Sequence, residues 1–318
     1  MKSSQKALII FSLCLITLSI VGIFDKIFWI SDLVSHFRIQ YLILGILGLV
    51  VTLVLMQKKV LIYFLFLTVL AVNSIYVFQY RPSRWEKSFE AYGLKIISFN
   101  LNRANRKTAE FKRYIQTANP DVLMVYELTP EWAQVIGQMK DVFPFAQATI
   151  QNDNFGIGIL SKHPLSKTVV RRLSQAETPV LETRMIDENF ELNLIALHAF
   201  PPITSEAKGW RDNYLLRVSN FVQKLKGESV VCGDFNQAPW ATSIKNFLEQ
   251  SGLSLSQGHF ALPTWPTTIP GLRIPIDHCF VSQGLSVVDY RRGPDIGSDH
   301  FPIELTIALK GIRSLSSD

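Results

Sequence analysis

Three long apolar stretches near the start of the chain place the strongest constraint on its architecture. No charged side chain interrupts any of them, and they span residues 7–24, 41–56 and 60–78. Each approaches the roughly 17–25 residues that a helix needs to cross a bilayer. We therefore predict a membrane anchor over residues 1–80, with about three transmembrane helices. A cleaved signal peptide is the alternative for the first stretch, although residues 21–29 contain no small-x-small cleavage site.

Basic residues near these stretches bear on membrane orientation. Lys2 and Lys6 precede the first stretch, and Lys58 and Lys59 occupy the short second loop, which favours a cytoplasmic N-terminus. The basic residues on the opposite side are Lys26, Arg38, Arg81, Arg84 and Lys87. Because the first helix usually dominates, we expect a multi-pass protein of the cell membrane whose C-terminal part lies outside the cytoplasm.

The positive charge of the chain is concentrated in this N-terminal part. The formal net charge is +6, yet from Leu94 onward 23 Lys and Arg residues face 22 Asp and Glu residues. A dedicated non-specific DNA-binding domain would carry a basic stripe over its soluble part. No such stripe is visible in the linear sequence.

The three cysteines say little about the cellular compartment. Cys14 lies in the first apolar stretch, whereas Cys232 and Cys279 lie inside strand-like runs. We interpret the latter two as small apolar core residues and expect no disulfide framework.

The remainder of the chain has the pattern of an α/β domain. A polar linker over residues 81–93 leads into a domain over residues 94–310, followed by a polar tail over residues 311–318. Helical spacing marks residues 107–116 and 205–226. Apolar runs predict strands over residues 94–100, 121–127, 156–161, 180–186, 190–198, 229–234, 276–282 and 303–309. Many strands with few helices indicate two sheets with helices outside.

Polar side chains recur where these strands end. Two segments carry most of them: Gly233-Asp234-Phe235-Asn236 and Gly297-Ser298-Asp299-His300. A single His or Asn after a strand is more often a turn or cap residue. Phosphoester hydrolysis, however, needs oxygen ligands for a hard metal, donors for the phosphoryl oxygens and a proton acceptor for water. These segments supply all three.

An ordered series of short motifs resembles the endonuclease/exonuclease/phosphatase superfamily. In chain order they are Ser98-Phe99-Asn100, Tyr126-Glu127, Leu197-His198, Gly233-Asp234-Phe235-Asn236, Thr264-Trp265-Pro266, Ile276-Asp277-His278 and Ser298-Asp299-His300. The resemblance covers about Leu94 to Leu309. It implies a four-layer α/β sandwich, in which helices flank two packed and mainly antiparallel sheets.

The resemblance also implies a magnesium site. Glu127, assisted by Asn100 and Asp299, resembles the family's ligands for Mg²⁺, for which Mn²⁺ can substitute. Asn102 stands where the apurinic endonuclease branch has Asp, and Tyr126 stands where Gln often precedes the metal Glu. We therefore expect a single cation.

Five further residues take catalytic roles in this comparison. His300 resembles the imidazole at the reacting centre, held and charged by Asp277. Asp234 resembles the group that aligns or deprotonates the attacking water, and Asn236 a donor to a non-bridging oxygen. His198 resembles the second imidazole, which protonates a leaving group or binds phosphate.

Four residues are candidates for substrate contacts. Asn102 and Asn154 are two of them, and Asn154 is also the nearest candidate partner of His198. Arg184 reaches phosphate or, equally, forms a surface ion pair with an acid such as Glu182. Trp265 either packs or forms a substrate wall. We interpret His278 as a structural histidine because it alternates with Asp277 along its strand.

The favoured function is a membrane-anchored, Mg²⁺-dependent phosphodiesterase or phosphatase that uses in-line attack of water on phosphorus. Its expected partners are the bilayer and a phosphoester in a lipid headgroup, nucleotide or nucleic acid, with no obligate protein partner. One alternative is a nuclease for extracytoplasmic DNA or RNA. A second is a non-catalytic binding scaffold, which the retained candidate residues disfavour.

Overall fold

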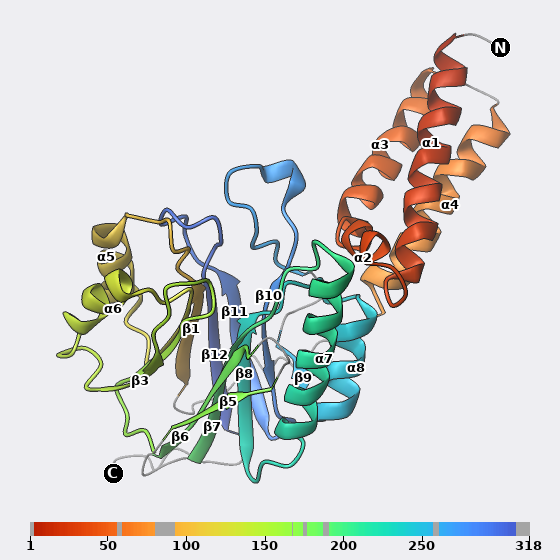
Figure 1. Cartoon of the computed structure of the whole chain (residues 1–318). Helices are drawn as coiled ribbons and strands as arrows, with labels where there is room; N and C mark the ends of the chain where they lie inside the picture. Colours follow the sequence, from red (N-terminus) through yellow and green to blue (C-terminus); the bar gives the residue numbers. More distant parts are fainter. Residues whose placement is uncertain are drawn as a thin grey trace, which may run out of the picture.

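The protein consists of a bundle of apolar helices joined to a larger domain with two β-sheets (Figure 1). The computed structural model describes residues 3–55, 59–79, 93–166, 168–173, 177–186, 191–256 and 261–309. The predicted linker therefore lies outside the described residues except for Gly93, and the predicted polar tail lies wholly outside them.

Three long helices form the bundle, namely α1 (Ser3–Val21), α3 (Arg38–Leu55) and α4 (Val60–Val77). Together with the short helix η1 (Gly22–Phe24), α1 is long and apolar enough to cross a membrane, as are α3 and α4. This agrees with the three spans expected from the sequence. Gly48 allows α3 to approach α4 closely, because a Cβ at that position would collide with the Phe66 ring.

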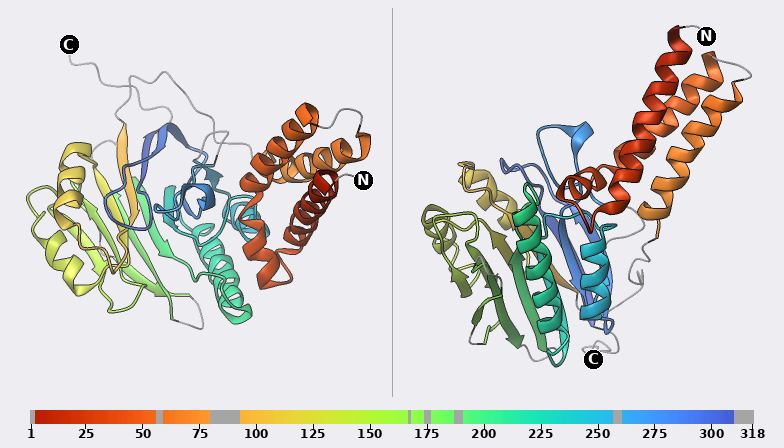
Figure 2. Two further views of the ribbon diagram at one scale, coloured as in Figure 1. Left: turned by 90° about the horizontal axis from the view of Figure 1, so that it is seen from above. Right: turned by 45° about the vertical axis from the view of Figure 1, so that its right-hand side comes forward.

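The segment between the first two apolar helices contains a short helix, α2 (Trp29–Ser35), that the sequence patterns did not predict. Figure 2 shows α2 at the foot of the bundle, against the larger domain. Ser35 and Trp240 provide one of its contacts, since the Trp240 indole Nε1 donates to the Ser35 carbonyl over 2.6 Å. The bundle and the larger domain are therefore in direct contact.

Two six-stranded sheets form the core of the larger domain. The first has the order β11-β12-β1-β2-β4-β3 and the second β5-β6-β7-β8-β10-β9. Among the described strands, β1–β2 and β7–β8 are the parallel pairs, and the other pairs are antiparallel. The strands of the first sheet are β1 (Leu94–Asn100), β2 (Val122–Tyr126), β3 (Phe145–Thr149), β4 (Ile157–Ser161), β11 (Leu285–Arg292) and β12 (Ile303–Leu309). Those of the second are β5 (Val169–Arg172), β6 (Pro179–Ile186), β7 (Glu191–His198), β8 (Glu228–Asp234), β9 (Ser254–Leu255) and β10 (Asp277–Val281).

Four helices cover the outer faces of the sheets, two on each side (Figure 1). The first sheet packs against α5 (Thr108–Ala118) and α6 (Pro130–Gly137), with Phe111 and Trp132 in the interface. The second packs against α7 (Ser205–Val222) and α8 (Thr242–Ser251), with Tyr214 and Phe247 in the interface. A third apolar cluster fills the space between the sheets. The expected four-layer α/β sandwich is confirmed.

A disulfide joins Cys232 of β8 to Cys279 of β10. These two cysteines are directly opposite each other in the antiparallel pair, and both side chains lie in the cluster between the sheets. The expectation of two unlinked apolar cysteines is therefore wrong. The strand register, which the sequence alone did not reveal, brings the two sulfur atoms together.

Candidate active site

The two parallel strand pairs bring the candidate residues to one edge of the sandwich. Asn100 is the last residue of β1, and Glu127 follows β2, its parallel neighbour. His198 and Asp234 end β7 and β8 and are paired in register. Because parallel strands end at the same edge of a sheet, the four side chains converge although 134 positions separate Asn100 from Asp234. The Asn100 Nδ2 donates to Asp234 Oδ2 over 3.1 Å, which links the two sheets.

Three residues at this edge have left-handed backbone conformations. The φ angles are 55° at Asn102, 57° at Glu127 and 49° at Asn236. Asn tolerates this region, but a Glu there is uncommon and raises the energy of the backbone. Such conformations concentrate at binding and catalytic sites. Here they turn the chain sharply just after strands β1, β2 and β8.

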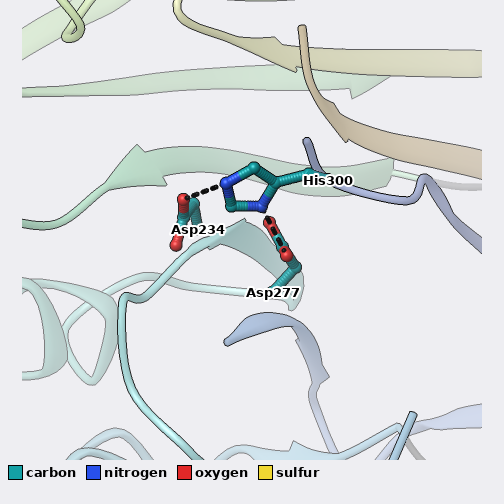
Figure 3. A group of neighbouring side chains, drawn as sticks. All are labelled: Asp234, Asp277 and His300. Carbon is teal, nitrogen blue, oxygen red and sulfur yellow. Dashed lines mark hydrogen bonds and ion pairs between the residues drawn. The ribbon is translucent and has the colours of Figure 1, made fainter. Parts of the chain in front are cut away.

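Asp234, Asp277 and His300 form a buried group in contact with one another (Figure 3). The His300 ring donates from Nδ1 to Asp277 Oδ2 over 2.9 Å, and its Nε2 lies 3.6 Å from Asp234 Oδ2. The two carboxylates come from paired positions of β8 and β10. The exposed fraction of each residue is 5% or less. The group therefore places one imidazole between two carboxylates in a largely desolvated environment.

Burial and charge shift the pKa values of this group. Burial raises the pKa of Asp234 to about 6, and the neighbouring Asp277 carboxylate adds to the increase while the His300 and His198 imidazoles oppose it. Burial alone would lower the pKa of His300. The two carboxylates and the hydrogen bond from Asp277 outweigh that effect and raise the pKa to about 10. At neutral pH the His300 side chain is thus an imidazolium.

His198 faces the same carboxylate from the other side. Its Nδ1 donates to the backbone carbonyl of Asn154 over 2.8 Å, which leaves Nε2 directed at Asp234 Oδ2, 3.5 Å away. The Asn236 amide Nδ2 is also 3.5 Å from this Nε2 and donates to the Ala199 carbonyl over 2.9 Å. Asn154 is therefore the partner of His198, as the sequence suggested, but through its backbone. The group that orients the His198 ring is uncharged.

Glu127 and Asn100 supply oxygen donors suited to a divalent cation. The half-buried Glu127 carboxylate accepts from the Arg103 backbone N–H over 2.9 Å and from Asn100 Nδ2 over 3.3 Å. Across the residues that the structure describes, no Lys or Arg side chain forms an ion pair with it. Its negative charge is therefore available to a cation, and a carboxylate that lines the pocket fits Mg²⁺.

Asp234, Asp277 and His300 also place ligand-type atoms within 4.8 Å of one another. An imidazole must be neutral to bind a metal, whereas the raised pKa of His300 keeps it protonated. Its Nδ1 is moreover engaged with Asp277.

Asp299, Asn102 and Trp265 form a separate network at the edge of the site. The two Asp299 carboxylate oxygens accept from Asn102 Nδ2 over 2.7 Å and from Trp265 Nε1 over 2.9 Å. Asn102 in turn donates its backbone N–H to Asn100 Oδ1 over 3.0 Å. Asp299 is thus linked to Asn100 indirectly, through hydrogen bonds that Asn102 makes to both residues. Among the described contacts, Asp299 has no direct hydrogen bond to Glu127 or Asn100.

Arg184 is not brought to this site. It lies opposite Asn193 in the β6–β7 register, five residues along β7 from His198. Its guanidinium forms an ion pair with Glu191 over 2.6 Å. The surface ion pair that the sequence left open is therefore present, and Arg184 is not among the residues that line the pocket of the site.

The site lies in a pocket of about 410 Å³ that includes residues missed by the sequence patterns. Besides Glu127, His198, Asp234, Asn236 and His300, the pocket is lined by Leu33, His36 and Phe37, which lie in or just after α2. A polar Asp32 and His36 within a mostly apolar N-terminal region were the only sequence signal for this contact.

Comparisons with known proteins agree with this fold. A model of the Endonuclease/Exonuclease/phosphatase family matches residues 97–300. A structure of zebrafish (D. rerio) TDP2 complexed with single-strand DNA product is similar with a TM-score of 0.58 at 17% identity, over 68% of this chain and 98% of that one. A beta toxin from Staphylococcus aureus is similar with a TM-score of 0.52 at 15% identity, over 67% and 99%.

A protein from Beutenbergia cavernae described as an endonuclease/exonuclease/phosphatase is similar with a TM-score of 0.57 at 17% identity, over 69% of this chain and 72% of that one. At these identities the structural likeness shows the fold alone. A search among proteins of curated function gives no match.

Proposed function

Because the chain belongs to the endonuclease/exonuclease/phosphatase family, we propose that it is a divalent-metal-dependent phosphoester hydrolase held at a membrane by its N-terminal helices. The observation that carries this proposal is the buried Asp277–His300–Asp234 group, whose Asp234 and His300 line one pocket together with Glu127, and whose Asp234 contacts Asn100. A buried imidazolium with an adjacent carboxylate base suits attack of water on phosphorus.

Asp234 is the base in this proposal. Its carboxylate receives a proton from the attacking water, and a pKa near 6 makes it basic while still mostly ionised at neutral pH. His300, held by Asp277, directs its charged Nε2–H into the pocket and stabilises the negative charge on a non-bridging phosphoryl oxygen.

His198 and Asn236 complete the arrangement. The Nε2 of His198 is placed to give a proton to the departing oxygen, and the Asn236 amide to donate to a second phosphoryl oxygen. Glu127 and Asn100 would hold Mg²⁺ or Mn²⁺. Once bound, the cation supplies neutralisation of charge on the phosphate and the leaving group.

We place the catalytic domain outside the cytoplasm. Two observations support this side of the membrane: Lys2 and Lys6 before the first apolar helix, and the Cys232–Cys279 disulfide. Disulfides persist in oxidising compartments and are rare in the reducing cytosol.

The nuclease alternative has less support. No Lys or Arg occurs among the described residues that line the pocket, whereas a basic flank would be expected for a nucleic-acid backbone. A binding scaffold without catalysis would have no need to keep a buried imidazole between two buried carboxylates, because burying charged groups costs free energy and such groups concentrate at functional sites.

The test is hydrolysis by the purified full-length protein in detergent micelles. We expect release of 4-nitrophenol from bis(4-nitrophenyl) phosphate or 4-nitrophenyl phosphate with Mg²⁺, and its loss with EDTA. Asp234→Asn should lower the rate by about 10²–10⁴-fold, since it removes the base. The matched control is Asp289→Asn on β11, whose side chain is 42% exposed. Absence of hydrolysis on both substrates, or an undiminished rate in EDTA, would refute the proposal.

A further inference from the structure

One end of the catalytic pocket is formed by the segment that connects two apolar helices. Leu33, His36 and Phe37 line the same pocket as His198 and His300. The family match begins only at residue 97. This wall is therefore an addition to the family fold, supplied by the anchor itself.

The wall is fixed to the catalytic domain by buried polar contacts. Asp32 of α2 pairs with Arg211 of α7 over 2.6 Å, and each side chain is 1% exposed. The Gln237 amide donates to Asp32 over 2.6 Å, and its oxygen contacts His36. Gln237 directly follows Asn236 in the active site. The position of α2 is thus coupled to the catalytic loop after β8.

Chain connectivity places this wall at the bilayer surface. Only residues 25–37 separate the first candidate span, which ends at Phe24, from the second, which begins at Arg38. At the start of α3, Gln40 donates to the Arg273 carbonyl over 2.6 Å. This contact holds the loop that contains η2 (Pro270–Leu272) next to the end of α3 that is nearest to α2. Figure 1 shows this loop projecting beside the foot of the bundle.

Exposed apolar side chains lie on both sides of this junction. Ile203, which lines the pocket, is 62% exposed, and Ile269 just before η2 and Leu272 at its end have about half their surface exposed. On the anchor side, Ile27 and Phe28 are 64% and 60% exposed. In water such surface is unfavourable, whereas at a bilayer surface it can contact lipid.

The pocket combines two kinds of lining. Glu127, Asp234 and His300 are polar, while the lining residues Leu33, Phe37, Pro201, Pro202, Ile203 and Ile274 are apolar. A small water-soluble phosphoester would leave these apolar side chains in contact with water. A molecule with a phosphodiester and a hydrocarbon part matches both kinds of lining.

We infer that α2 and the 201–203 segment form a hydrocarbon subsite, and that the substrate is a phospholipid presented by the bilayer in which the protein is anchored. This inference rests on the proposed phosphoester hydrolysis. The Pro201 to Ile203 segment lies just after His198, so the hydrocarbon-bearing alcohol is the leaving group. Water oxygen bonds to phosphorus, Asp234 takes the water proton, and the phosphorus–oxygen bond to the lipid alcohol breaks as that oxygen receives a proton from His198. The products are a hydrocarbon alcohol in the bilayer and a phosphorylated headgroup in water.

The test compares two substrates with the same full-length protein. Vesicles of phosphatidylcholine, phosphatidylglycerol and sphingomyelin in equal parts report water-soluble phosphorylated headgroups, and bis(4-nitrophenyl) phosphate in detergent reports hydrolysis without a hydrocarbon chain. Ile203→Ser and Leu33→Ser should lower kcat/KM for the phospholipid relative to the soluble diester by about tenfold. Ile186→Ser at a 48% exposed position of β6 outside the pocket is the matched control, with no change in this ratio expected.

Each outcome decides one of the two proposals. Hydrolysis of neither substrate refutes the proposed phosphoester activity. Hydrolysis of the soluble diester without release of phosphorylated headgroups refutes only the lipid inference. An equal effect of Ile203→Ser and Leu33→Ser on both substrates also refutes it, because a hydrocarbon subsite must act selectively. Release of the headgroup as a free alcohol would show that the other ester bond is cleaved and would refute the assigned leaving group.

Discussion

Removal of the Cys232–Cys279 disulfide should destabilise the catalytic domain strongly. The bridge joins residues 47 positions apart and so restricts a long loop of the unfolded chain. On the loop-entropy model, a closed loop of this length contributes about 4 kcal/mol at 25 °C. In a domain of this size each kcal/mol corresponds to a Tm change of about 2–4 °C, so we expect a decrease of about 8–16 °C.

The same bridge stands two residues from each carboxylate of the active-site pair. Cys232 precedes Asp234 on β8, and Cys279 follows Asp277 on β10. Both carboxylates contact His300, and their positions depend on the spacing of these two strands. Reduction should therefore lower the hydrolysis rate at temperatures well below the new Tm.

The assay is thermal unfolding of the full-length protein in detergent, followed by tryptophan fluorescence with and without reductant. Reductant should lower the Tm of the wild type, whereas the double variant Cys232→Ala/Cys279→Ala should have the same low Tm with and without reductant. The control Cys14→Ala alters an exposed cysteine of α1 and should retain the response to reductant. Alkylation of Cys232 and Cys279 in protein purified without reductant, or a Tm that reductant leaves unchanged, would refute the reasoning.

Three further predictions concern single residues. Asp32→Ala should lower the free energy of unfolding by about 3–5 kcal/mol in chemical denaturation, because it leaves the buried Arg211 guanidinium without one of its two partners. Adding Arg211→Met to this variant should restore part of the loss. An unchanged free energy of unfolding in Asp32→Ala would contradict the buried pair. Glu127→Gln should raise the Mg²⁺ concentration for half-maximal activity by at least about tenfold in a metal titration, and an unchanged value would remove Glu127 from the metal site. Burial lowers the pKa of His278 to about 4 from an ordinary 6.5, so its contribution to the free energy of unfolding is full above pH 6.5 and is lost as the pH falls toward 4. In chemical denaturation at pH 7.5 and pH 4, His278→Gln should make the acid-induced loss of stability smaller by about 3 kcal/mol. An identical loss in both proteins would contradict this assignment.

Strands buried on both faces could be predicted from the sequence, whereas exposed edge strands could not. The runs 94–100 and 303–309 coincide with β1 and β12, which are adjacent in the first sheet. At the edges, β3 and β5 are largely exposed, and without a buried face they show no apolar run or alternation. Tertiary pairing, which is not visible locally, defines them.

Short elements that depend on tertiary contacts were also missed. The seven residues of α2 are too few to form a stable helix alone. Its contacts with Arg211, Gln237 and Trp240 lie more than 170 positions away in the sequence. No local pattern could identify α2 as part of the active-site pocket.

The residues of the candidate active site also differed in how far the sequence could predict them. Asn100, Asp234, Asp277 and His300 could be chosen because their types and order along the chain suit phosphoester chemistry, and the structure brings them together. The partner of His198 is a backbone carbonyl, which every residue carries and no sequence motif marks. Side-chain type therefore predicted the polar side chains of the site, while the fold determined the backbone partner of His198.

The most direct measurement of the central claim is hydrolysis in ¹⁸O-labelled water. The full-length protein with Mg²⁺ is given bis(4-nitrophenyl) phosphate, and mass spectrometry locates the label in the products. Attack of water on phosphorus predicts one ¹⁸O atom in 4-nitrophenyl phosphate, none in 4-nitrophenol, and a rate of labelling that Asp234→Asn lowers by about 10²–10⁴-fold. Label in the 4-nitrophenol, or equal labelled product from Asp234→Asn, would contradict the assignment of this site.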